Sequence, residues 1–486
     1  MIQSVRNLLL AGGLLLLAGG SCQKKPDATP TPTSTPTPTP AVPSQVALWL
    51  TTPDKSALFA RVRLPLNFAA PVAGSPGPVI AVDTTKTYQG IDGFGYTLTG
   101  GSAQVIHQLG PADRAALLKE LFATDSTWLG VSYLRVSIGA SDLSSQVFTY
   151  DDVPGGQTDV NQDQFSLAPD QADLIPVLKE ILAINPSIKI LGSPWTAPSW
   201  MKDNNSPVGG SLKPAYYDAY AKYFVKYVQG MKALGIPIDA VTLQNEPLNP
   251  YNNPSMVMQA AEQAAFIKNS VGPAFAAAGL TTKIICYDHN ADRPDYPIAV
   301  LTDAGARPYV DGSAFHLYGG TIDALSTVHD AFPAKNIYFT EQYVNAPGNF
   351  AADLAWAVNN LIIGATRNWS RNVLEWNLAA DPFNGPHTNG GCSTCLPAVT
   401  IGGAALVRNP SYYIIAHASK FVRPGSVRVD TNVPASLPNV AFKTPSGQRV
   451  LIVLNTGSAL QSFGVQYKGK VLATSLAGGA VATYVW

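Results

Sequence analysis

Residues 240–287 read AVTLQNEPLNPYNNPSMVMQAAEQAAFIKNSVGPAFAAAGLTTKIICY, and they carry the clearest structural signal in the chain. The segment opens with a short apolar run at 240–244, continues with a long helical pattern at 256–278, and closes with a second apolar run at 283–287. Two short strands joined by one helix are typical of a β-α-β unit, in which the two strands are parallel. A parallel sheet is therefore expected wherever this unit recurs.

The unit recurs along most of the chain. Strand patterns are predicted at 93–98, 133–138, 188–193, 240–244, 283–287, 312–316, 336–340 and 373–377. Helical patterns are predicted at 111–122, 171–184, 214–234, 256–278, 297–304, 322–331, 350–365 and 411–421. Eight strands that each precede a helix predict an α/β fold of the (β/α)8 TIM barrel type. A doubly wound sheet is less favoured, because no glycine-rich phosphate fingerprint opens the first unit.

Both flanks of the barrel pattern are predicted to be β structure. Beyond residue 424 the chain changes to short strand patterns separated by turn residues, at 426–429, 440–443, 450–454, 463–467 and 480–486. The N-terminal flank also contains strand patterns, at 47–50 and 60–64. We therefore expect a catalytic barrel at 89–423 with an attached all-β sandwich built from both chain ends, residues 45–88 and 424–486.

Residues 1–22 have the pattern of an export signal. Arg6 precedes an apolar run that is too short for a comfortable membrane span, and small residues then lead to Cys22. We expect a lipoprotein-type signal peptide with lipidation of Cys22. Ordinary secretory cleavage is the alternative, because Gly19 stands where such signals usually carry leucine. The Thr/Pro-rich residues 23–44 predict a semi-rigid linker. The expected location is the bacterial outer membrane or cell surface, otherwise the periplasm or the medium.

The charge composition limits the partners of the chain. Its 486 residues contain 32 basic and 32 acidic side chains, so the formal net charge is zero. Proteins that bind phosphate backbones or anionic membranes usually carry a basic surface. Nucleic acid is therefore not an expected partner, and membrane contact is expected only through the N-terminal lipid.

Two glutamates follow predicted barrel strands directly. Glu246 lies in Asn245-Glu246-Pro247 after the fourth strand, and Glu341 follows the seventh strand. The C-terminal ends of barrel strands form the active site, and strands four and seven face each other across the ring. Pro247 is expected to hold the backbone of Glu246 extended, with its carboxylate over the barrel mouth. The two carboxylates are therefore expected to oppose each other.

Opposed carboxylates fit one reaction class well. Retaining glycoside hydrolysis needs a proton donor and a nucleophile roughly 5 to 5.5 Å apart. The alternative is that each glutamate only caps a helix or pairs with a lysine. A metal-dependent hydrolase is less favoured, because the six histidines are scattered along the sequence.

Asn245-Glu246-Pro247 and Thr340-Glu341-Gln342, with six other segments, resemble glycoside hydrolase family 30. The other six are Asp92-Gly93-Phe94-Gly95, Leu134-Arg135-Val136-Ser137, Gly139-Ala140-Ser141-Asp142, Ser193-Pro194-Trp195-Thr196-Ala197-Pro198-Ser199-Trp200-Met201-Lys202, Phe315-His316-Leu317-Tyr318 and Glu375-Trp376-Asn377-Leu378. The resemblance implies a barrel with an attached sandwich. It also implies retaining cleavage of β-glucosidic bonds, with Glu246 as acid/base and Glu341 as nucleophile.

The resemblance further implies a sugar-binding site around the glutamates. Asn245 would hold the sugar 2-hydroxyl, a contact that strengthens in the transition state. Asp142, Trp195 and Trp376 would line the glycone site, where a carboxylate accepts hydrogen bonds from hydroxyls and indoles cover the apolar sugar face. The alternatives are a loop asparagine satisfied by the backbone and tryptophans that belong to the core.

Three further residues are expected close to Glu341. Arg135 should lie below it, where a fixed positive charge would keep Glu341 ionised while Glu246 stays protonated. Arg135 as a purely structural ion-pair partner is the alternative. His316 and Tyr318 end the sixth strand and are candidate substrate-binding residues, with a core role left open for both. Asp288-His289-Asn290, after the fifth strand, is expected to offer polar groups to the far side of the cleft.

The cysteines indicate a disulfide rather than a metal site. Cys392 and Cys395 form a single CxxC in the loop after the eighth strand, and zinc would need further ligands. In an exported protein a local disulfide is expected, and it would stiffen a loop at the active site. Cys286 is expected to be a buried thiol. No cofactor and no metal are expected.

The substrate within the family depends on weaker signals. Residues 46–52, VALWLTT, and 390–395, GGCSTC, look most like bacterial family members associated with β-1,6-glucan. We therefore expect an endo-β-1,6-glucanase that acts on carbohydrate. Glucosylceramidase is the first alternative, and β-xyloside cleavage is also known in the family. A surface glycan-binding protein without catalysis is the second alternative, although both carboxylates and Asn245 are retained.

Overall fold

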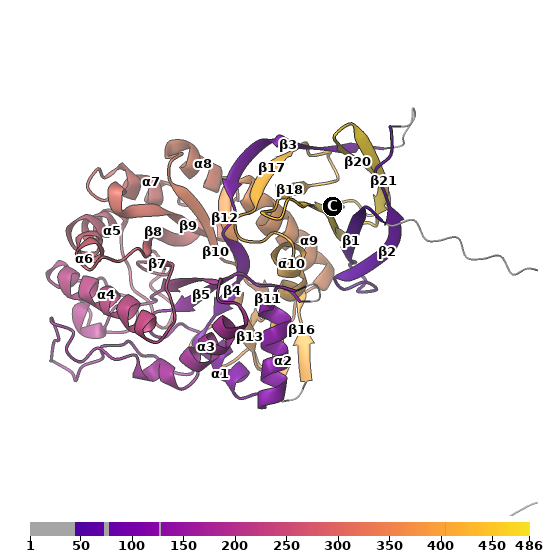
Figure 1. Ribbon diagram of the computed structural model, residues 1–486. Helices are drawn as coiled ribbons and strands as arrows, with labels where there is room; N and C mark the ends of the chain where they lie inside the picture. The colour runs from indigo at the N-terminus through magenta and orange to yellow at the C-terminus, as the bar shows by residue number, and fades with distance from the viewer. Residues whose placement is uncertain (1–43, 72–76, 126–127, 404) are drawn as a thin grey trace, which may run out of the picture. The chain divides into compact units, whose positions relative to one another are not determined.

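The computed structural model describes residues 44–71, 77–125, 128–403 and 405–486 (Figure 1). The predicted signal peptide at 1–22, the lipidation site Cys22 and all of the predicted linker except Ser44 lie outside the described residues. Among the described residues, no helix combines the length and the apolar character needed to cross a bilayer.

Eight parallel strands close into a barrel and follow one another in chain order around the ring. They are β4 (Gly93–Leu98), β5 (Tyr133–Ser137), β6 (Lys189–Ser193), β7 (Ala240–Thr242), β8 (Lys283–Ala291), β9 (Val310–Gly320), β10 (Asn336–Glu341) and β12 (Ser370–Asn377). All eight coincide with predicted strands. The predicted TIM barrel is therefore confirmed.

Helices lie between the barrel strands in the chain, as the alternation predicts (Figure 1). They are α1 (Gly100–His107), α2 (Pro111–Phe122), α3 (Leu174–Ile184), α4 (Tyr217–Ala233), α5 (Ala260–Phe266), α6 (Gly272–Ala277), α7 (Asp295–Thr302), α8 (Ala324–Ala331), α9 (Phe350–Ala357) and α10 (Pro410–Ser419). Helix α1 was not predicted, because it opens on two glycines. The helix predicted at 256–278 is present from residue 260 to 277, but a π-helical turn at Ile267–Val271 lies between α5 and α6, where Pro273 has no N–H to donate.

The chain ends build the sandwich together, as predicted. Its strands are β1 (Val46–Thr51), β2 (Ala60–Leu66), β3 (Val79–Gly90), β17 (Val427–Thr431), β18 (Asn439–Lys443), β19 (Arg449–Leu454), β20 (Gln461–Tyr467), β21 (Lys470–Leu476) and β22 (Val481–Val485). β1 pairs antiparallel with β22, and β3 pairs with both β17 and β20. β21 was not predicted. The tight turn at Lys468-Gly469, where both residues have positive φ, is the signal that marks this hairpin.

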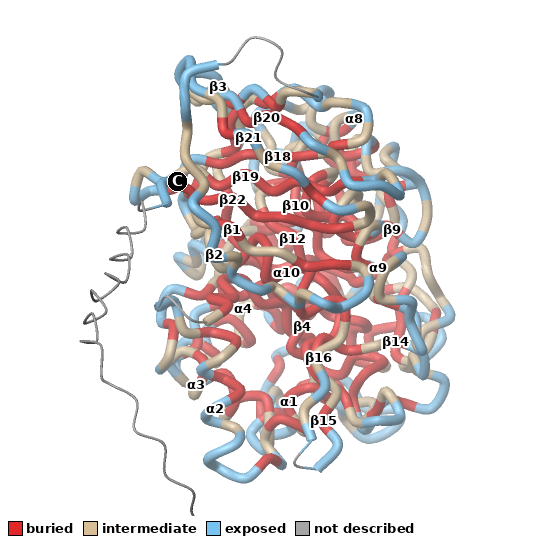
Figure 2. Tube along the Cα trace, turned by 90° about the vertical axis from the view of Figure 1, so that its right-hand side faces the viewer, coloured by how far each residue is buried: buried red, intermediate tan, exposed pale blue. Residues whose placement is uncertain are grey.

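The middle strands of the sandwich are buried on both faces. On β19, Leu451 and Val453 belong to the core of the sandwich, whereas Val450 and Ile452 belong to the core that includes the barrel. Figure 2 shows β18, β19 and β22 buried along most of their length. Because alternate side chains face two cores, this sheet is the shared wall between sandwich and barrel.

His417 fixes helix α10 to two strands of the sandwich. Its Nδ1 lies 2.8 Å from Thr483 Oγ1 and its Nε2 lies 2.8 Å from Thr51 Oγ1. The Thr483 hydroxyl also donates to the His417 carbonyl at 3.1 Å, so it accepts from a protonated Nδ1. Burial lowers the pKa of His417 to about 3, and the ring is therefore neutral. This contact joins the last barrel helix to the strands at both chain ends.

Candidate active site

A cavity of about 450 Å3 opens where the barrel strands end. Both predicted catalytic glutamates line it, together with five of the predicted substrate-binding residues. These are Asp142, Trp195, Asn245, Tyr318 and Trp376. The sequence therefore placed most of the site correctly around one cavity. His316 is absent from the cavity lining, and Arg135 lies below Glu341 as expected; neither side chain is exposed to solvent.

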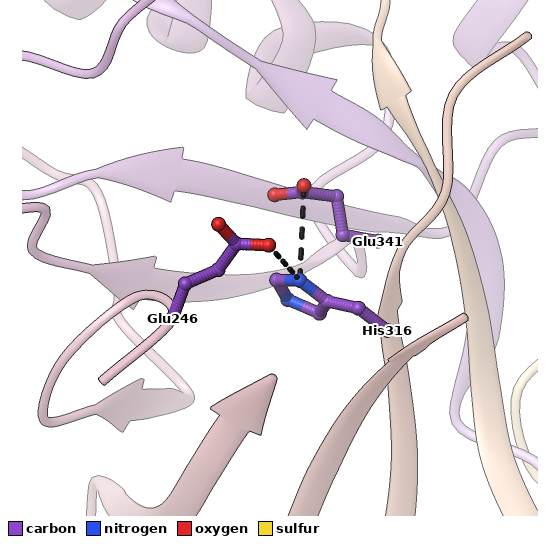
Figure 3. Close-up of side chains that lie close together, drawn as sticks. All are labelled: Glu246, His316 and Glu341. Atoms are coloured by element: carbon purple, nitrogen blue, oxygen red, sulfur yellow. Dashed lines mark hydrogen bonds and ion pairs between the residues drawn. The ribbon is translucent and has the colours of Figure 1, made fainter. Parts of the chain in front are cut away.

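Glu246 and Glu341 face each other across the floor of the cavity (Figure 3). One oxygen of each carboxylate and one ring nitrogen of His316 all lie within 4.8 Å of one another. Retaining glycosidases hold their two carboxyl groups roughly 5 to 5.5 Å apart, whereas inverting enzymes hold them roughly 6.5 to 9.5 Å apart. Two carboxylate oxygens this close match the retaining arrangement, in which an anomeric carbon but no additional water lies between the carboxyl groups.

The backbone at Glu246 does not have the predicted extended geometry. Its φ is 47°, in the left-handed region that non-glycine residues rarely adopt. The N–H of Glu246 donates to the Asp288 carbonyl at 2.9 Å, and its carbonyl accepts from the N–H of Asn249 at 2.8 Å. These bonds hold a tight turn that Pro247 does not prevent. Such a conformation costs on the order of 1–3 kcal/mol, and active sites are where this cost is commonly found.

Two loop asparagines hold the Glu246 carboxylate. Asn249 donates to Oε2 at 2.7 Å, and Asn252 donates to the same oxygen at 3.3 Å. Neither residue was predicted. The available signal was the polar run NPYNN directly after the Glu246 segment.

The guanidinium of Arg135 organises the floor of the site. It donates to Glu341 Oε2 at 2.6 Å, to Asn245 Oδ1 at 2.6 Å and to Asp288 Oδ2 at 2.8 Å. Its Nε donates to Ser193 Oγ at 3.1 Å. Arg135 lies directly against Glu341, where the sequence placed it. Because the Asn245 oxygen is engaged by Arg135, the asparagine amide N–H2 is left for the cavity.

Asp288 is the buried anion opposite Arg135, not a cleft residue. It accepts hydrogen bonds from Thr242 at 2.7 Å and Thr340 at 2.6 Å, and it lies 3.2 Å from His316 Nε2. Burial raises the pKa of Asp288, but Arg135 and His316 outweigh burial and hold the pKa well below its usual range. The prediction that Asp288 faces the cleft is wrong, because positive φ at Tyr287 and Asp288 and a shift in register disturb the alternation of β8.

His316 lies between the carboxylates and beneath them, is fully buried, and is absent from the cavity lining, so of the two roles left open the structure favours the buried one. Its Nδ1 lies 3.2 Å from Glu246 Oε1 and 3.8 Å from Glu341 Oε1 (Figure 3). Burial alone would lower the pKa of His316. The charge of Glu341 and the hydrogen bonds with Asp288 and Glu246 outweigh burial and raise the pKa to about 9. The ring is therefore an imidazolium at neutral pH.

The two catalytic candidates differ in their electrostatics. Burial raises the pKa of both carboxyls. For Glu246, the hydrogen bond and charge of His316 outweigh burial and lower the pKa to about 2. For Glu341, burial outweighs His316 and Arg135, and its pKa is raised. The surroundings of Glu246 thus favour its ionised form in the ligand-free site, with the proton on the neighbouring His316. The expected role of Glu246 as the proton donor stays a prediction.

The positive charges of the site argue against a bound cation. Glu246, His316 and Glu341 are the group of three potential metal ligands found among the described residues. The pKa of His316 is raised, and the guanidinium of Arg135 forms ion pairs with Glu341 and Asp288. A metal ion would have to displace a proton and approach a fixed cation, so we propose no metal site here.

A second wall of the cavity contains two stacked indoles. The rings of Trp195 and Trp376 are 5.4 Å apart at an angle of 30°, and the Arg135 guanidinium lies 4.8 Å from the Trp195 ring. Tyr318, whose hydroxyl donates to Glu341 Oε1 at 3.0 Å, also lines the cavity. An apolar face beside hydrogen-bonding groups is the chemistry that binds a sugar ring.

A disulfide closes the wall that carries Asp142. Cys392 and Cys395 are bonded, as expected, and both line the cavity. The N–H of Cys392 lies 3.3 Å from Asp142 Oδ2, to which it donates. Burial raises the pKa of Asp142 to about 7, with Glu341 adding to the effect. Asp142 can therefore both accept and donate hydrogen bonds near neutral pH.

Comparisons with known proteins agree on one family. Residues 91–422 match the sequence model of the Glycosyl hydrolase family 30 TIM-barrel domain, and residues 425–484 match that of the Glycosyl hydrolase family 30 beta sandwich domain. An endo-1,6-beta-D-glucanase of Neurospora crassa is 38% identical over 385 residues, which cover 74% of this chain and 78% of the relative. The lysosomal acid glucosylceramidase of Mus musculus is 30% identical over 413 residues, covering 79% of this chain and 78% of the relative.

A solved structure supports the same grouping. The endo-beta1,6-glucanase BT3312 has a similar fold, with a TM-score of 0.84 and 37% sequence identity. The match covers 91% of this chain and 99% of the other. The similarity therefore extends over the barrel and the sandwich together.

Replacing Arg135 with Met should lower the free energy of unfolding by about 3–5 kcal/mol, because Asp288 would be left as a buried charge without its partner. Chemical denaturation at neutral pH measures the change. Arg408→Met is the matched control, since the Arg408 pair with Glu120 is partly exposed and should cost about 1 kcal/mol or less. Equal losses in the two variants would contradict a special role for the Arg135 network.

Proposed function

We propose a substrate and a mechanism on the premise that the chain belongs to glycosyl hydrolase family 30 and is a glycoside hydrolase. The substrate that we propose is β-1,6-glucan, cleaved within the chain with retention of configuration. Relatives at 37% and 38% identity carry the name of this activity. The observation that carries the proposal is the approach of Glu246 and Glu341 to within 4.8 Å at the ends of two facing strands.

In the first step Glu341 is the nucleophile and Glu246 the acid. A Glu341 oxygen forms a bond to the anomeric carbon while the bond to the glycosidic oxygen breaks. Glu246 gives its proton to that oxygen, so the leaving sugar departs as an alcohol. Arg135 and Tyr318 hydrogen-bond to different oxygens of Glu341 and hold it toward the carbon.

In the second step Glu246 is the base. It takes a proton from water, the water oxygen bonds to the anomeric carbon, and the Glu341 ester bond breaks. Two inversions at the same carbon give net retention. Asn245 directs its amide N–H2 at the sugar 2-hydroxyl because its oxygen is bound to Arg135, and this contact strengthens as positive charge develops on the ring.

The proton for the first step comes from His316 in this proposal. In the ligand-free site His316 is charged, and its Nδ1 lies 3.2 Å from Glu246 Oε1. A bound sugar excludes water from Glu246 and raises its pKa, so the proton moves from Nδ1 to Oε1. The proton that Glu246 later takes from water returns to His316. One proton leaves with the alcohol in the first step and another arrives from water in the second, so the site returns to its starting charge.

The full chain should release gluco-oligosaccharides from pustulan, a linear β-1,6-glucan, with the new reducing ends first formed as the β-anomer. Chromatography identifies the products and early NMR spectra give the anomer. Glu341→Gln should lower the rate by about 1,000-fold or more, since it removes the nucleophile. The control is Glu262→Gln, which alters a glutamate in the first turn of α5.

Other products would change the assignment. Release of glucose from glucosylceramide but no cleavage of pustulan would favour the glucosylceramidase alternative. The first-formed α-anomer would contradict the double displacement. Binding of pustulan without cleavage of any β-glucoside would favour a glycan-binding protein.

The pH profile tests the role of His316. The active form contains the His316 proton and an ionised Glu341. kcat/KM should therefore fall on the acid side as Glu341, whose pKa is raised, takes up a proton, and on the alkaline side as the pH rises through about 9. His316→Gln removes the proton store, so the alkaline limb should move to lower pH by about one unit or more. His289→Gln is the control, because burial lowers the pKa of His289 and leaves it neutral in this range. An alkaline limb that stays in place in His316→Gln would contradict the relay.

We also propose that Cys22 carries a lipid that anchors the enzyme outside the cell. The support is the pattern in residues 1–22 and the Thr/Pro-rich segment that follows. Such an anchor would hold the catalytic barrel near a surface while it acts on an external polysaccharide.

Metabolic labelling with palmitate tests the anchor. The full chain, expressed in a bacterium that makes lipoproteins, should take up the label and partition into detergent. Cys22→Ser should do neither, whereas Cys286→Ser, which alters a buried cysteine, should behave as the wild type. An unlabelled, secreted wild-type chain would favour ordinary signal cleavage.

A further inference from the structure

Tyr251 is a solvent-exposed aromatic residue at the candidate active site. It lines the cavity, yet 87% of the residue is exposed. It lies five residues after Glu246, in the loop between β7 and α5. None of the roles assigned above uses it. An exposed ring at the border of a sugar-binding cavity is a surface on which a second sugar can stack.

The loop holds Tyr251 in a defined place relative to Glu246. The Tyr251 N–H donates to Asn249 Oδ1 at 3.0 Å, and Asn249 Nδ2 donates to Glu246 Oε2 at 2.7 Å. One asparagine side chain thus links the backbone of the tyrosine to the carboxylate that would protonate the leaving oxygen.

The far end of the same loop is fixed as well. Ser255 donates from its hydroxyl to the Pro250 carbonyl at 3.0 Å, and the buried amine of Lys202 donates to the Ser255 carbonyl at 2.7 Å. A loop held at both ends presents its ring at little cost in conformational entropy when a ligand binds.

The position of the loop identifies which part of the substrate Tyr251 meets. The glycone side of the cavity is walled by Asp142, the stacked indoles and the disulfide. Asn249 and Asn252 of the loop bind Oε2 of Glu246, whereas Oε1 and the nucleophile Glu341 both lie on His316 Nδ1. The loop therefore contacts the oxygen of Glu246 that is turned away from Glu341, on the side where the leaving sugar would extend. Tyr251 is therefore on the leaving-group side.

We propose that Tyr251 is the platform for the first glucosyl unit on the leaving-group side. This inference rests on the proposed function. In a β-1,6 linkage the leaving ring is joined through its C6 methylene, so it stands one carbon farther from the glycosidic oxygen than in other linkages. A ring placed at the cavity border rather than against Glu246 suits that geometry. The C–H face of the glucosyl ring stacks on the phenol. The β-1,6 linkage is recognised because only its extra methylene places the ring that far from the glycosidic oxygen.

Tyr251→Ala should lower kcat/KM on pustulan by roughly 5- to 20-fold, mainly through KM. Hydrolysis of β-glucosyl fluoride should change less than about 2-fold, because fluoride leaves without occupying the platform. Tyr251→Phe should keep the wild-type rate on pustulan. Phe383→Ala is the matched control, since Phe383 is 84% exposed and lies outside the cavity lining.

A transfer experiment tests the platform separately from glycone binding. With β-glucosyl fluoride as donor and gentiobiose, the β-1,6 disaccharide, as acceptor, the wild type should form trisaccharide. Tyr251→Ala should form mostly glucose from the same donor. Unchanged transfer, or an equal loss on pustulan and on the fluoride, would overturn the inference.

The two proposals fail in distinguishable ways. Cleavage of pustulan at equal rates by wild type and Tyr251→Ala would overturn the platform and leave the proposed substrate in place. A wild type that hydrolyses the fluoride but no β-1,6-glucan would overturn the proposed substrate and the platform with it. Equal losses in Tyr251→Ala and Phe383→Ala would also overturn the platform, because the effect would not be local.

Discussion

The guanidinium of Arg135 has no contact with solvent, so all of its hydrogen bonds must be satisfied inside the protein. Its partners come from four different places around the barrel, on or after β6, β7, β8 and β10. A planar donor with fixed directions can be satisfied only if those partners hold their positions. The buried guanidinium is satisfied only when the barrel is closed. The same hydrogen bonds then hold Glu341 and Asn245 in place.

The charges near Arg135 allow one proton, shared by His316 and Glu246, to move, whereas Asp288 stays ionised. Asp288 is held ionised by two cations, whereas His316 and Glu246 share a hydrogen bond across which a proton can move. Glu246 and Glu341 have the same side chain but acquire different roles from their surroundings, as in other paired-carboxylate sites. The left-handed backbone at Glu246 is part of this arrangement, because it turns the carboxylate toward His316.

The repeating parts of the fold were predictable from sequence because their signals are periodic. Each barrel strand is a short apolar run and each is followed by a helical pattern, so the strand ends that carry Glu246 and Glu341 could be located. Asp288 was misplaced because a bulge in β8 reverses the alternation at one residue. His316 was assigned to substrate because its depth below the cavity has no sequence signal. Tyr251 was missed because loop residues obey no period, and only exposure and neighbours reveal their use.

The pairing of β1 with β22 has a consequence for how the chain acquires its structure. These strands lie more than 400 residues apart in sequence, yet they are neighbours in the sheet whose other face belongs to the core that includes the barrel. During synthesis the N-terminal strand must wait for the last strand to emerge, and contacts between such distant segments form slowly. The exposed edge of a half-built sheet is also where chains pair wrongly. The sheet can therefore be completed only after β22 has been synthesised. A truncation that removes β22 would expose apolar residues of both cores to solvent.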